Sequence, residues 1–136
     1  MRVALATLCD GLTPRDDGRV DILGAAPDLV QVARFPWQGR LTFALVLELG
    51  PEDERSGLGL NVSVVRASDG EVVGQVDPAS AKQQREVPTG VAGPVHMPFE
   101  LGLDVTIPEP DTYAVLVRNP EGMRLAHATL AVQLKG

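Results

Sequence analysis

Cys9, the only cysteine of the chain, could act as a nucleophile, because a thiolate attacks carbon and sulfur readily. A working thiolate needs a neighbouring base, and the chain has two histidines, His96 and His127. Nothing in the sequence places either imidazole beside Cys9, which closes an apolar run before Asp10. We therefore interpret Cys9 as a small buried apolar side chain and predict no catalytic residue.

Carboxylates in predicted loops could bind calcium, because hard oxygen ligands need no tight spacing in the sequence. The candidate ligands are Asp10, Asp16, Asp17, Asp69 and Glu121. Aspartate beside glycine is also the ordinary composition of a tight turn, and we favour that interpretation. Zinc is not expected, because the two histidines show neither HxH nor HxxxH spacing. No cofactor is predicted, since the chain has no phosphate-binding glycine loop and no dinucleotide fingerprint.

Aromatic residues between two predicted strands offer a binding surface. Phe35 and Trp37, the only tryptophan, flank Pro36. A tryptophan on a loop can stack on a sugar ring or anchor a protein partner. The alternative is that both rings plug one end of the fold, and we favour it because large aromatic side chains are usually buried.

The elements that position these residues are predicted to be strands, because apolar residues recur at every second position along most of the chain. The sequence predicts strands over residues 2–9, 18–24, 29–34, 40–49, 58–67, 70–76, 95–107, 111–118 and 122–134. The stretch 77–86 could form a helix or a loop. Pro98 cannot donate to a strand ladder, which predicts an edge position or a bulge within 95–107.

Turn signals separate the predicted strands at Asp17-Gly18, Asp69-Gly70, 108–111 and 119–122. Because each joins two β-type runs, we expect the flanking strands to form antiparallel hairpins. Many short strands without covering helices predict an all-β fold, a two-layer antiparallel β-sandwich of about seven to nine strands. A closed antiparallel barrel is the alternative. The 136 residues form one domain, since no linker or repeat divides residues 1–136.

Several runs are apolar on both faces, notably Val3–Leu8, Tyr113–Val117 and Ala126–Val132. An isolated sandwich should keep its outer faces polar. We therefore expect a second copy or another protein to cover one outer face or edge.

Charge excludes two classes of partner. The formal net charge is −6, and the 12 basic residues are scattered without a stripe or cluster. Nucleic acids and anionic membranes therefore lack an electrostatic attraction to the chain. A single cysteine permits no internal disulfide, which suits a reducing cytoplasm, where we expect the protein to be located.

The order of these features resembles an uncharacterised family of small bacterial β-sandwich proteins that has no assigned function. The resemblance consists of Leu8-Cys9-Asp10, the run from Val20 to Gly24, Phe35-Pro36 and the segment from Pro110 to Tyr113. This chain has Asp111 where the family tends to have glycine before the strand of the tyrosine. The resemblance implies a sandwich and a bacterial source but no reaction, substrate or cofactor.

Tyr113 can be interpreted without the family. A tyrosine just inside a strand after a proline-rich corner commonly buries its ring and donates its hydroxyl to the backbone of that corner. Taken together, the sequence predicts a non-catalytic sandwich that acts through protein contacts or self-association. The alternative is a small module that binds a carbohydrate or calcium through loop residues at one end.

Overall fold

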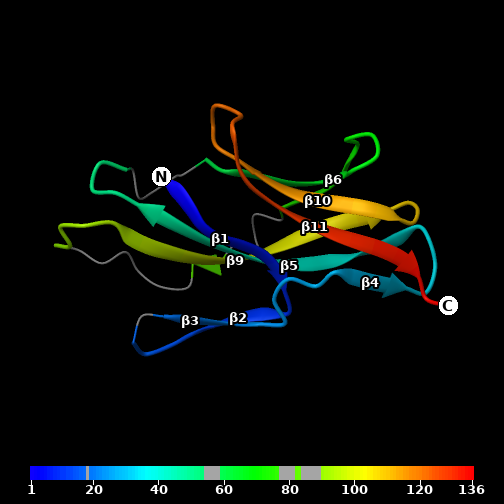
Figure 1. The fold of residues 1–136 in the computed structure, drawn as a ribbon, viewed down its shortest axis with the longest axis horizontal. Coiled ribbons are helices and arrows are strands. Elements are labelled where there is room, and N and C mark those ends of the chain that lie inside the picture. The colour runs from blue at the N-terminus through cyan, green and yellow to red at the C-terminus, as the bar shows by residue number, and fades with distance from the viewer. Residues whose placement is uncertain (18, 54–58, 77–81, 84–89) are drawn as a thin grey trace.

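The computed structural model describes residues 1–17, 19–53, 59–76, 82–83 and 90–136. In this part of the chain every regular element is a strand and no helix occurs, which confirms the all-β prediction. The strands run along the length of the molecule, with the two termini toward opposite ends (Figure 1). The bounds of the strands are β1 (Arg2–Cys9), β2 (Gly11–Pro14), β3 (Val20–Leu23), β4 (Leu29–Val32), β5 (Trp37–Leu49), β6 (Asn61–Arg66), β7 (Val72–Val76), β8 (Lys82–Gln83), β9 (Val95–Ile107), β10 (Asp111–Arg118) and β11 (Arg124–Leu134).

One continuous sheet contains nine of these strands. Its order is β1-β5-β9-β7-β6-β10-β11-β4, and β8 adds to the edge of β9. All neighbours are antiparallel except β11 and β4, which are parallel. The remaining strands, β2 and β3, form a small separate sheet.

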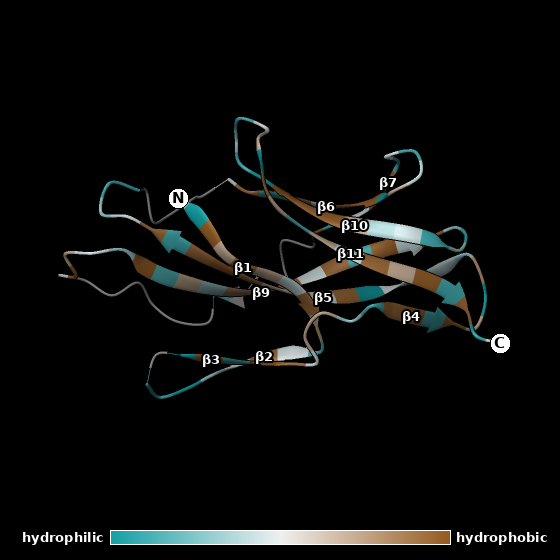
Figure 2. Cartoon of the chain, in the orientation of Figure 1, coloured by the Kyte–Doolittle hydropathy of each residue, from teal (hydrophilic) through white to brown (hydrophobic). Residues whose placement is uncertain are grey.

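The main sheet curls so that one face encloses the core. Alternate residues of β5, β9 and β10 point inward, as the period of two requires, and the strands are mainly hydrophobic while hydrophilic residues gather in the loops (Figure 2). The largest inward side chains that are almost completely buried are Phe43, Leu45, Leu47, Leu49, Met97, Leu103, Ile107 and Tyr113.

Strand β7 carries the sheet around its sharpest corner, because it pairs with β6 on one side and with β9 on the other. Gly74 belongs to both ladders, opposite Val64 and Val105. A Cβ atom at position 74 would collide with the carbonyl oxygen of Asp104 and lie 2.6 Å from Cγ1 of Val105. Glycine therefore permits the close approach of β7 to β9.

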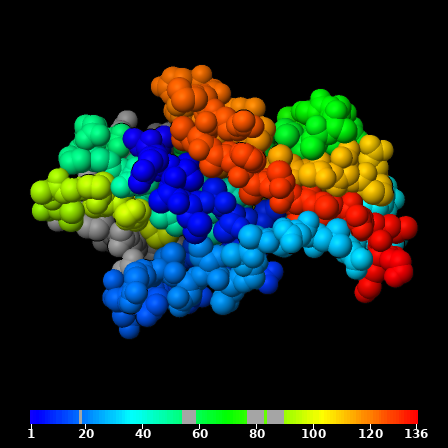
Figure 3. Space-filling model, in the orientation of Figure 1, coloured from blue at the N-terminus to red at the C-terminus, as the bar shows by residue number. Residues whose placement is uncertain are grey.

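The two ends of the curled sheet meet along a seam between β1 and β11. These strands lie side by side (Figure 3), but no ladder joins them among the described residues. The segment 24–28 bridges the seam: the Ala26 amide donates to the carbonyl of Leu8 (2.9 Å), and the carbonyl of Asp28 accepts from the Ala131 amide (3.1 Å). A cavity of about 310 Å³ remains there, partly lined by Ala6 and His127.

The seam and the continuous sheet refine the predicted architecture. Two separate packed sheets are not what the structure shows, so the sandwich is not confirmed. The alternative of a closed barrel also fails in the described part of the chain, because β1 and β11 approach each other without pairing.

The small β2–β3 sheet covers part of the outer surface. It packs Leu12, Val20 and Ile22 against Cys9 and Ala44. Strand β2 is absent from the sequence prediction, because four residues that end in proline give too short a pattern. Its presence explains why Ala44, on the face of β5 opposite to the core, is fully buried.

Two of the four predicted hairpins, β6–β7 and β10–β11, are confirmed. Strand β3 also has an antiparallel partner before it in the chain, but that partner is β2 and not the predicted strand 2–9. The hairpin predicted at 108–111 is wrong, because β9 and β10 do not pair with each other. The proline-rich segment instead carries the chain from one half of the curled sheet to the other. Most of the proposed helix 77–86 lies outside the described residues, and Lys82 and Gln83 are strand rather than helix.

Pro98 pairs with Val46 of β5 in an unbroken register, so the bulge that the sequence offered is not found in the ladder to β5. On the other side of β9, Lys82 and Gln83 pair with Glu100 and Phe99, and the position that continues this register opposite Pro98 lies outside the described residues. The edge position therefore stays a prediction.

Candidate functional site

Phe35 and Trp37 lie together at the end of the sheet where β4 leads into β5. Both side chains are partly buried against the main core. They also line a pocket of about 660 Å³ together with Arg34, Pro36 and Gln38. Their partial burial agrees with the favoured interpretation that the rings pack at one end of the core, and the pocket leaves the binding interpretation as a hypothesis.

The indole of Trp37 is held over Gly39. A Cβ atom at position 39 would lie 2.6 Å from Cη2 of Trp37, which is closer than carbon atoms approach without a collision. Trp37 and Gly39 are two residues apart on β5, so they share one face of the strand. The absence of a side chain at position 39 thus fixes where the ring lies.

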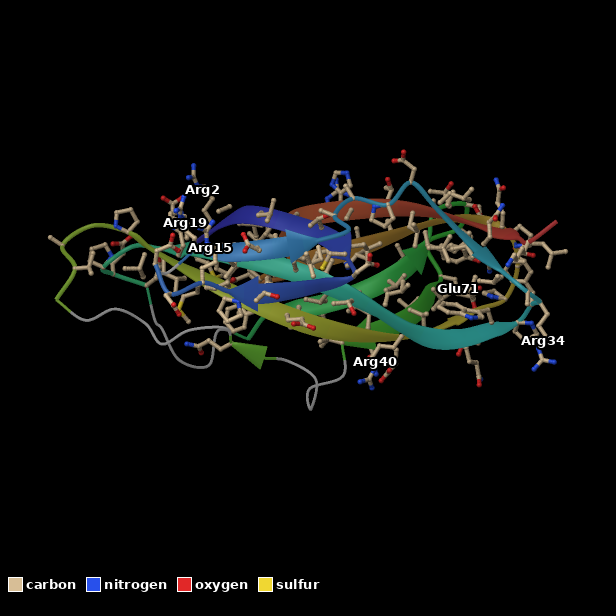
Figure 4. The ribbon with its side chains drawn as sticks, turned by 90° about the horizontal axis from the view of Figure 1, so that it is seen from below. Arg2, Arg15, Arg19, Arg34, Arg40 and Glu71 are labelled. Atoms are coloured by element: carbon tan, nitrogen blue, oxygen red, sulfur yellow. The ribbon has the colours of Figure 1, made fainter. Side chains whose placement is uncertain are left out.

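Arg34 gives this pocket its charge. Its side chain is exposed and lies at one extremity of the molecule (Figure 4). Among the described residues it forms no ion pair. Two aromatic rings, a guanidinium and the amide of Gln38 can stack on a planar ring and donate hydrogen bonds to its substituents.

Asp17, one of the predicted calcium ligands, is engaged by arginine. Its carboxylate accepts hydrogen bonds from the guanidinium of Arg19 at 2.9 and 2.6 Å and from the Arg19 amide at 3.0 Å. Arg15 lies 3.5 Å away. The hydrogen bonds from Arg19 lower the pKa of Asp17 below its ordinary value, so the carboxylate is occupied by its own turn.

Asp69 is engaged in the same way by Arg66. The guanidinium of Arg66 donates to Asp69 at 2.9 and 3.1 Å and to Glu109 at 2.8 Å, and it also contacts Glu71. These interactions raise the pKa of Arg66, and the hydrogen bond from Arg66 lowers the pKa of Asp69. Asp69 lies in the β6–β7 turn, which Figure 1 places away from the β2–β3 hairpin of Asp17.

The predicted gathering of carboxylates is not found. Asp10 lies against Gly24, Asp16 is exposed beside Asp17, and Glu121 is exposed in the β10–β11 turn. In the described part of the chain no three His, Cys, Asp or Glu side chains come together in a way that could hold a metal ion. Asp17 and Asp69 are satisfied by hydrogen bonds within their own turns, and the five candidates do not converge, so the calcium hypothesis has no support in this geometry.

Cys9 is buried in the small cluster with Leu12 and Ala44. Burial raises the pKa of its thiol, and the nearby carboxylate of Glu100 raises it further. Both effects keep the sulfur protonated at neutral pH and lower its nucleophilicity. The position fits the prediction of a small buried apolar side chain.

Tyr113 confirms the prediction of a tyrosine at a corner. Its ring is almost completely buried, and its hydroxyl donates to the carbonyl of Glu109 at 2.6 Å. Burial raises the pKa of the phenol. The bond fastens the crossing segment 108–111 to β10, which is a structural role.

A further surface emerges only from the strand register. The outward residues of β7, β6, β10, β11 and β4 lie opposite one another in adjoining ladders, and apart from Arg118 and Arg124 at one end none of them is Asp, Glu, Lys or Arg. We call this surface the uncharged face; its residues are Leu29, Gln31, Ser63, Val65, Val72, Gln75, Thr112, Ala114, Leu116, His127, Thr129, Ala131 and Gln133. The apolar runs suggested a covered outer face, but the sequence could not show which strands adjoin.

Charges limit the uncharged face on two sides. Beyond β7, the ion pair between Arg40 and Asp104 (2.9 Å) lies on the next two strands. At one end of β10 and β11, Arg118 lies directly opposite Arg124. Between these limits Val72 is 62 % exposed, whereas Leu116 is 8 % exposed.

No family model, no curated protein and no solved structure matches the chain. The resemblance to a bacterial family therefore stays an expectation. The described residues contain no helix that is long and apolar enough to cross a membrane.

Proposed function

We propose that this protein is a non-catalytic module that acts through protein contacts made by the uncharged face. The observation that carries the proposal is the composition of that face. Charged residues make up 22 % of the chain, yet the outward positions of five adjoining strands carry none apart from Arg118 and Arg124 at one end. Protein surfaces that face only water carry more charge than this, and depletion of charge is typical of the centre of an interface.

Two further features support the proposal. The thiol of Cys9 is buried and has a raised pKa, which disfavours it as a nucleophile. The curled sheet also presents its β6–β10–β11 half and its β9–β5–β1 half on opposite sides of one core, as the layers of a sandwich would be. In such an arrangement the outer face of one layer is free for a partner.

In-cell photocrosslinking tests the proposal. A photoreactive amino acid replaces Gln75 or Thr129, two exposed residues of the uncharged face, in the cells that make the protein. The control position is Thr106, an exposed outward residue of β9. We expect a discrete adduct from the two face positions and none from Thr106. Absence of adducts at the face, or equal adducts at all three positions, would contradict the proposal.

A second function has its own observation, the pocket that contains both predicted aromatic residues. We propose that the pocket at Phe35 and Trp37 binds a carbohydrate by stacking, with Arg34 and Gln38 as donors. The sole tryptophan reports binding directly through its fluorescence. A panel of neutral and acidic oligosaccharides should change the emission, and Arg34→Gln should weaken the effect. Unchanged emission across the panel would remove this candidate.

A further inference from the structure

We infer that the partner of the uncharged face is a second copy of this chain, stacked face to face about a two-fold axis with the β10 strands antiparallel. The inference rests on the proposed function and adds the identity of the partner. A two-fold axis brings the same surface of both copies together, so the surface must complement itself. The uncharged face meets this condition because its two ends carry opposite charge.

The basic end is formed by Arg118 and Arg124. They lie directly opposite each other on β10 and β11, where like charges are destabilising. In the described part of the chain neither forms an ion pair. Because no carboxylate of the described residues pairs with these two adjacent guanidinium groups, we infer that a carboxylate of another molecule does so.

The acidic end lies at the other end of the same strands. Asp69, Glu71 and Glu109 surround the single guanidinium of Arg66, and Asp111 accepts a hydrogen bond from the Ser68 hydroxyl at 2.6 Å. Three carboxylates therefore contact one arginine and Asp111 adds a fourth at the same end, which leaves an excess of negative charge. Glu71 immediately precedes Val72 of the uncharged face and is 59 % exposed (Figure 4).

Strand direction connects the two ends. Strand β10 runs from Asp111 at the acidic end to Arg118 at the basic end. At about 3.3 Å per residue, the two ends are about 23 Å apart. A two-fold axis through the middle of the face reverses β10 in the second copy, so each basic end lies over an acidic end. Parallel stacking would instead place arginine over arginine.

The size of the face sets the expected affinity. Five strands at about 4.8 Å spacing and about 23 Å long cover roughly 550 Å² per copy. Two copies together bury roughly 1,100 Å², near the lower limit for a specific interface. We therefore expect a weak dimer that dissociates at micromolar concentration.

Sedimentation equilibrium over the micromolar range tests the inference on the full chain. The native protein should pass from a 14.4 kDa monomer to a dimer. Arg118→Glu with Arg124→Glu should raise the dissociation constant by about ten-fold or more, because the acidic ends then repel each other. Glu71→Arg should weaken self-association likewise. An equimolar mixture of the two variants should recover the dimer, since both contacts become attractive again.

Two controls keep the result interpretable. Arg19→Glu makes the same change of charge per residue in an exposed arginine of the β2–β3 hairpin, outside the five strands of the face, and should leave the dissociation constant unchanged. Thr129→Glu places a charge at an exposed position inside the face, without touching the Arg66 cluster, and should weaken the dimer. Circular dichroism melting establishes that each variant is folded.

The outcomes separate the inference from the proposed function. A protein that stays monomeric throughout, or a dimer that tolerates all the charge changes, overturns the two-fold stack. In the monomeric case, crosslinks from Gln75 and Thr129 to a protein of another mass would still support a protein-contact function. Crosslinks at twice the mass of the chain, together with recovery in the mixture, support the dimer.

Discussion

At the scale of single residues, the contact between Trp37 and Gly39 gives a direct prediction. Gly39→Ala forces the indole to move, because the new methyl group would collide with the ring. We expect a loss of about 1 to 3 kcal/mol in the free energy of unfolding, the usual cost of overpacking, and a red shift of tryptophan emission. Urea denaturation followed by fluorescence measures both.

Gly11→Ala is the matched control, because a Cβ atom at position 11 meets nothing within 4 Å. It should change the free energy of unfolding by no more than about 0.5 kcal/mol. Equal effects of the two substitutions would show that the Trp37 contact does not constrain position 39.

Tyr113 allows a second prediction at this scale. Tyr113→Phe keeps the buried ring but removes the hydrogen bond to the carbonyl of Glu109. We expect a loss of about 1 kcal/mol, the typical net contribution of one hydrogen bond. Chemical denaturation measures it, and an unchanged midpoint would mean that the crossing segment needs no such bond.

Residue roles were predictable from the sequence where the determining partner is near in the chain. Tyr113 bonds to the carbonyl four residues before it, and Cys9 follows an apolar strand, so both were interpreted correctly. The favoured turn interpretation likewise holds for Asp17 and Asp69, whose arginine partners are two and three positions away. The contact of Arg66 with Glu109 was not predictable, because it spans 43 positions of the chain.

At the scale of elements, Gly74 in β7 determines whether the sheet can turn its corner. Gly74→Ala would place a methyl group against the backbone of β9, at Asp104 and Val105. Because backbone cannot give way as a flexible side chain can, we expect a loss of about 2 to 3 kcal/mol. Hydrogen exchange should show faster exchange of the β7 and β9 amides than of those in β10 and β11.

The alternative outcome is informative. If Gly74→Ala leaves exchange in β7 unchanged, the two ladders must adjust to the extra carbon without separating. Gly70→Ala is a poor control because Gly70 has a positive φ, whereas Gly93 has an open environment and serves better.

The bounds of a strand were predictable where apolar and polar residues alternate over many positions. The bounds of β9 and β10 coincide with the predicted 95–107 and 111–118, because period two over many residues leaves little choice. Strands β2 and β8, of four and two residues, are too short to give a pattern. Pairing was harder to predict: Pro108 to Asp111 has the composition of a hairpin turn but carries the chain across to another part of the sheet.

At the scale of the whole molecule, the sequence predicted an all-β domain but not one continuous sheet. A strand that is apolar on one face fits a sandwich, a barrel or a curled sheet equally well. What distinguishes them here is the corner at Gly74 and the seam closed by the Ala26 and Asp28 bridge, both of which depend on contacts distant in the chain. The uncharged face likewise follows from strand order and not from local pattern.

The stability of the whole molecule should decline toward both acid and alkali. The pKa values of Asp17 and Asp69 are lowered in the folded protein by hydrogen bonds from arginine. A carboxyl group with a lowered folded pKa stabilises the fold above its unfolded pKa, near 3.8, and this stabilisation is lost as the pH falls through the folded pKa. The raised pKa of Tyr113 acts in the opposite sense: its contribution is present below the unfolded value of 10.0 and is lost as the pH rises through the folded pKa.

Thermal unfolding across the pH scale tests this expectation. The melting temperature should be flat between about pH 5 and pH 9 and fall on either side. Arg66→Gln removes the partner of Asp69, so the melting temperature should drop on the plateau and the acid limb should become shallower. Arg40→Gln is the control, because its ion pair with Asp104 is exposed on both sides and an exposed ion pair contributes little to stability. A melting temperature that rises from pH 5 to pH 3, or an acid limb that is equally steep without Arg66, would contradict a stabilising role for the Arg66 cluster.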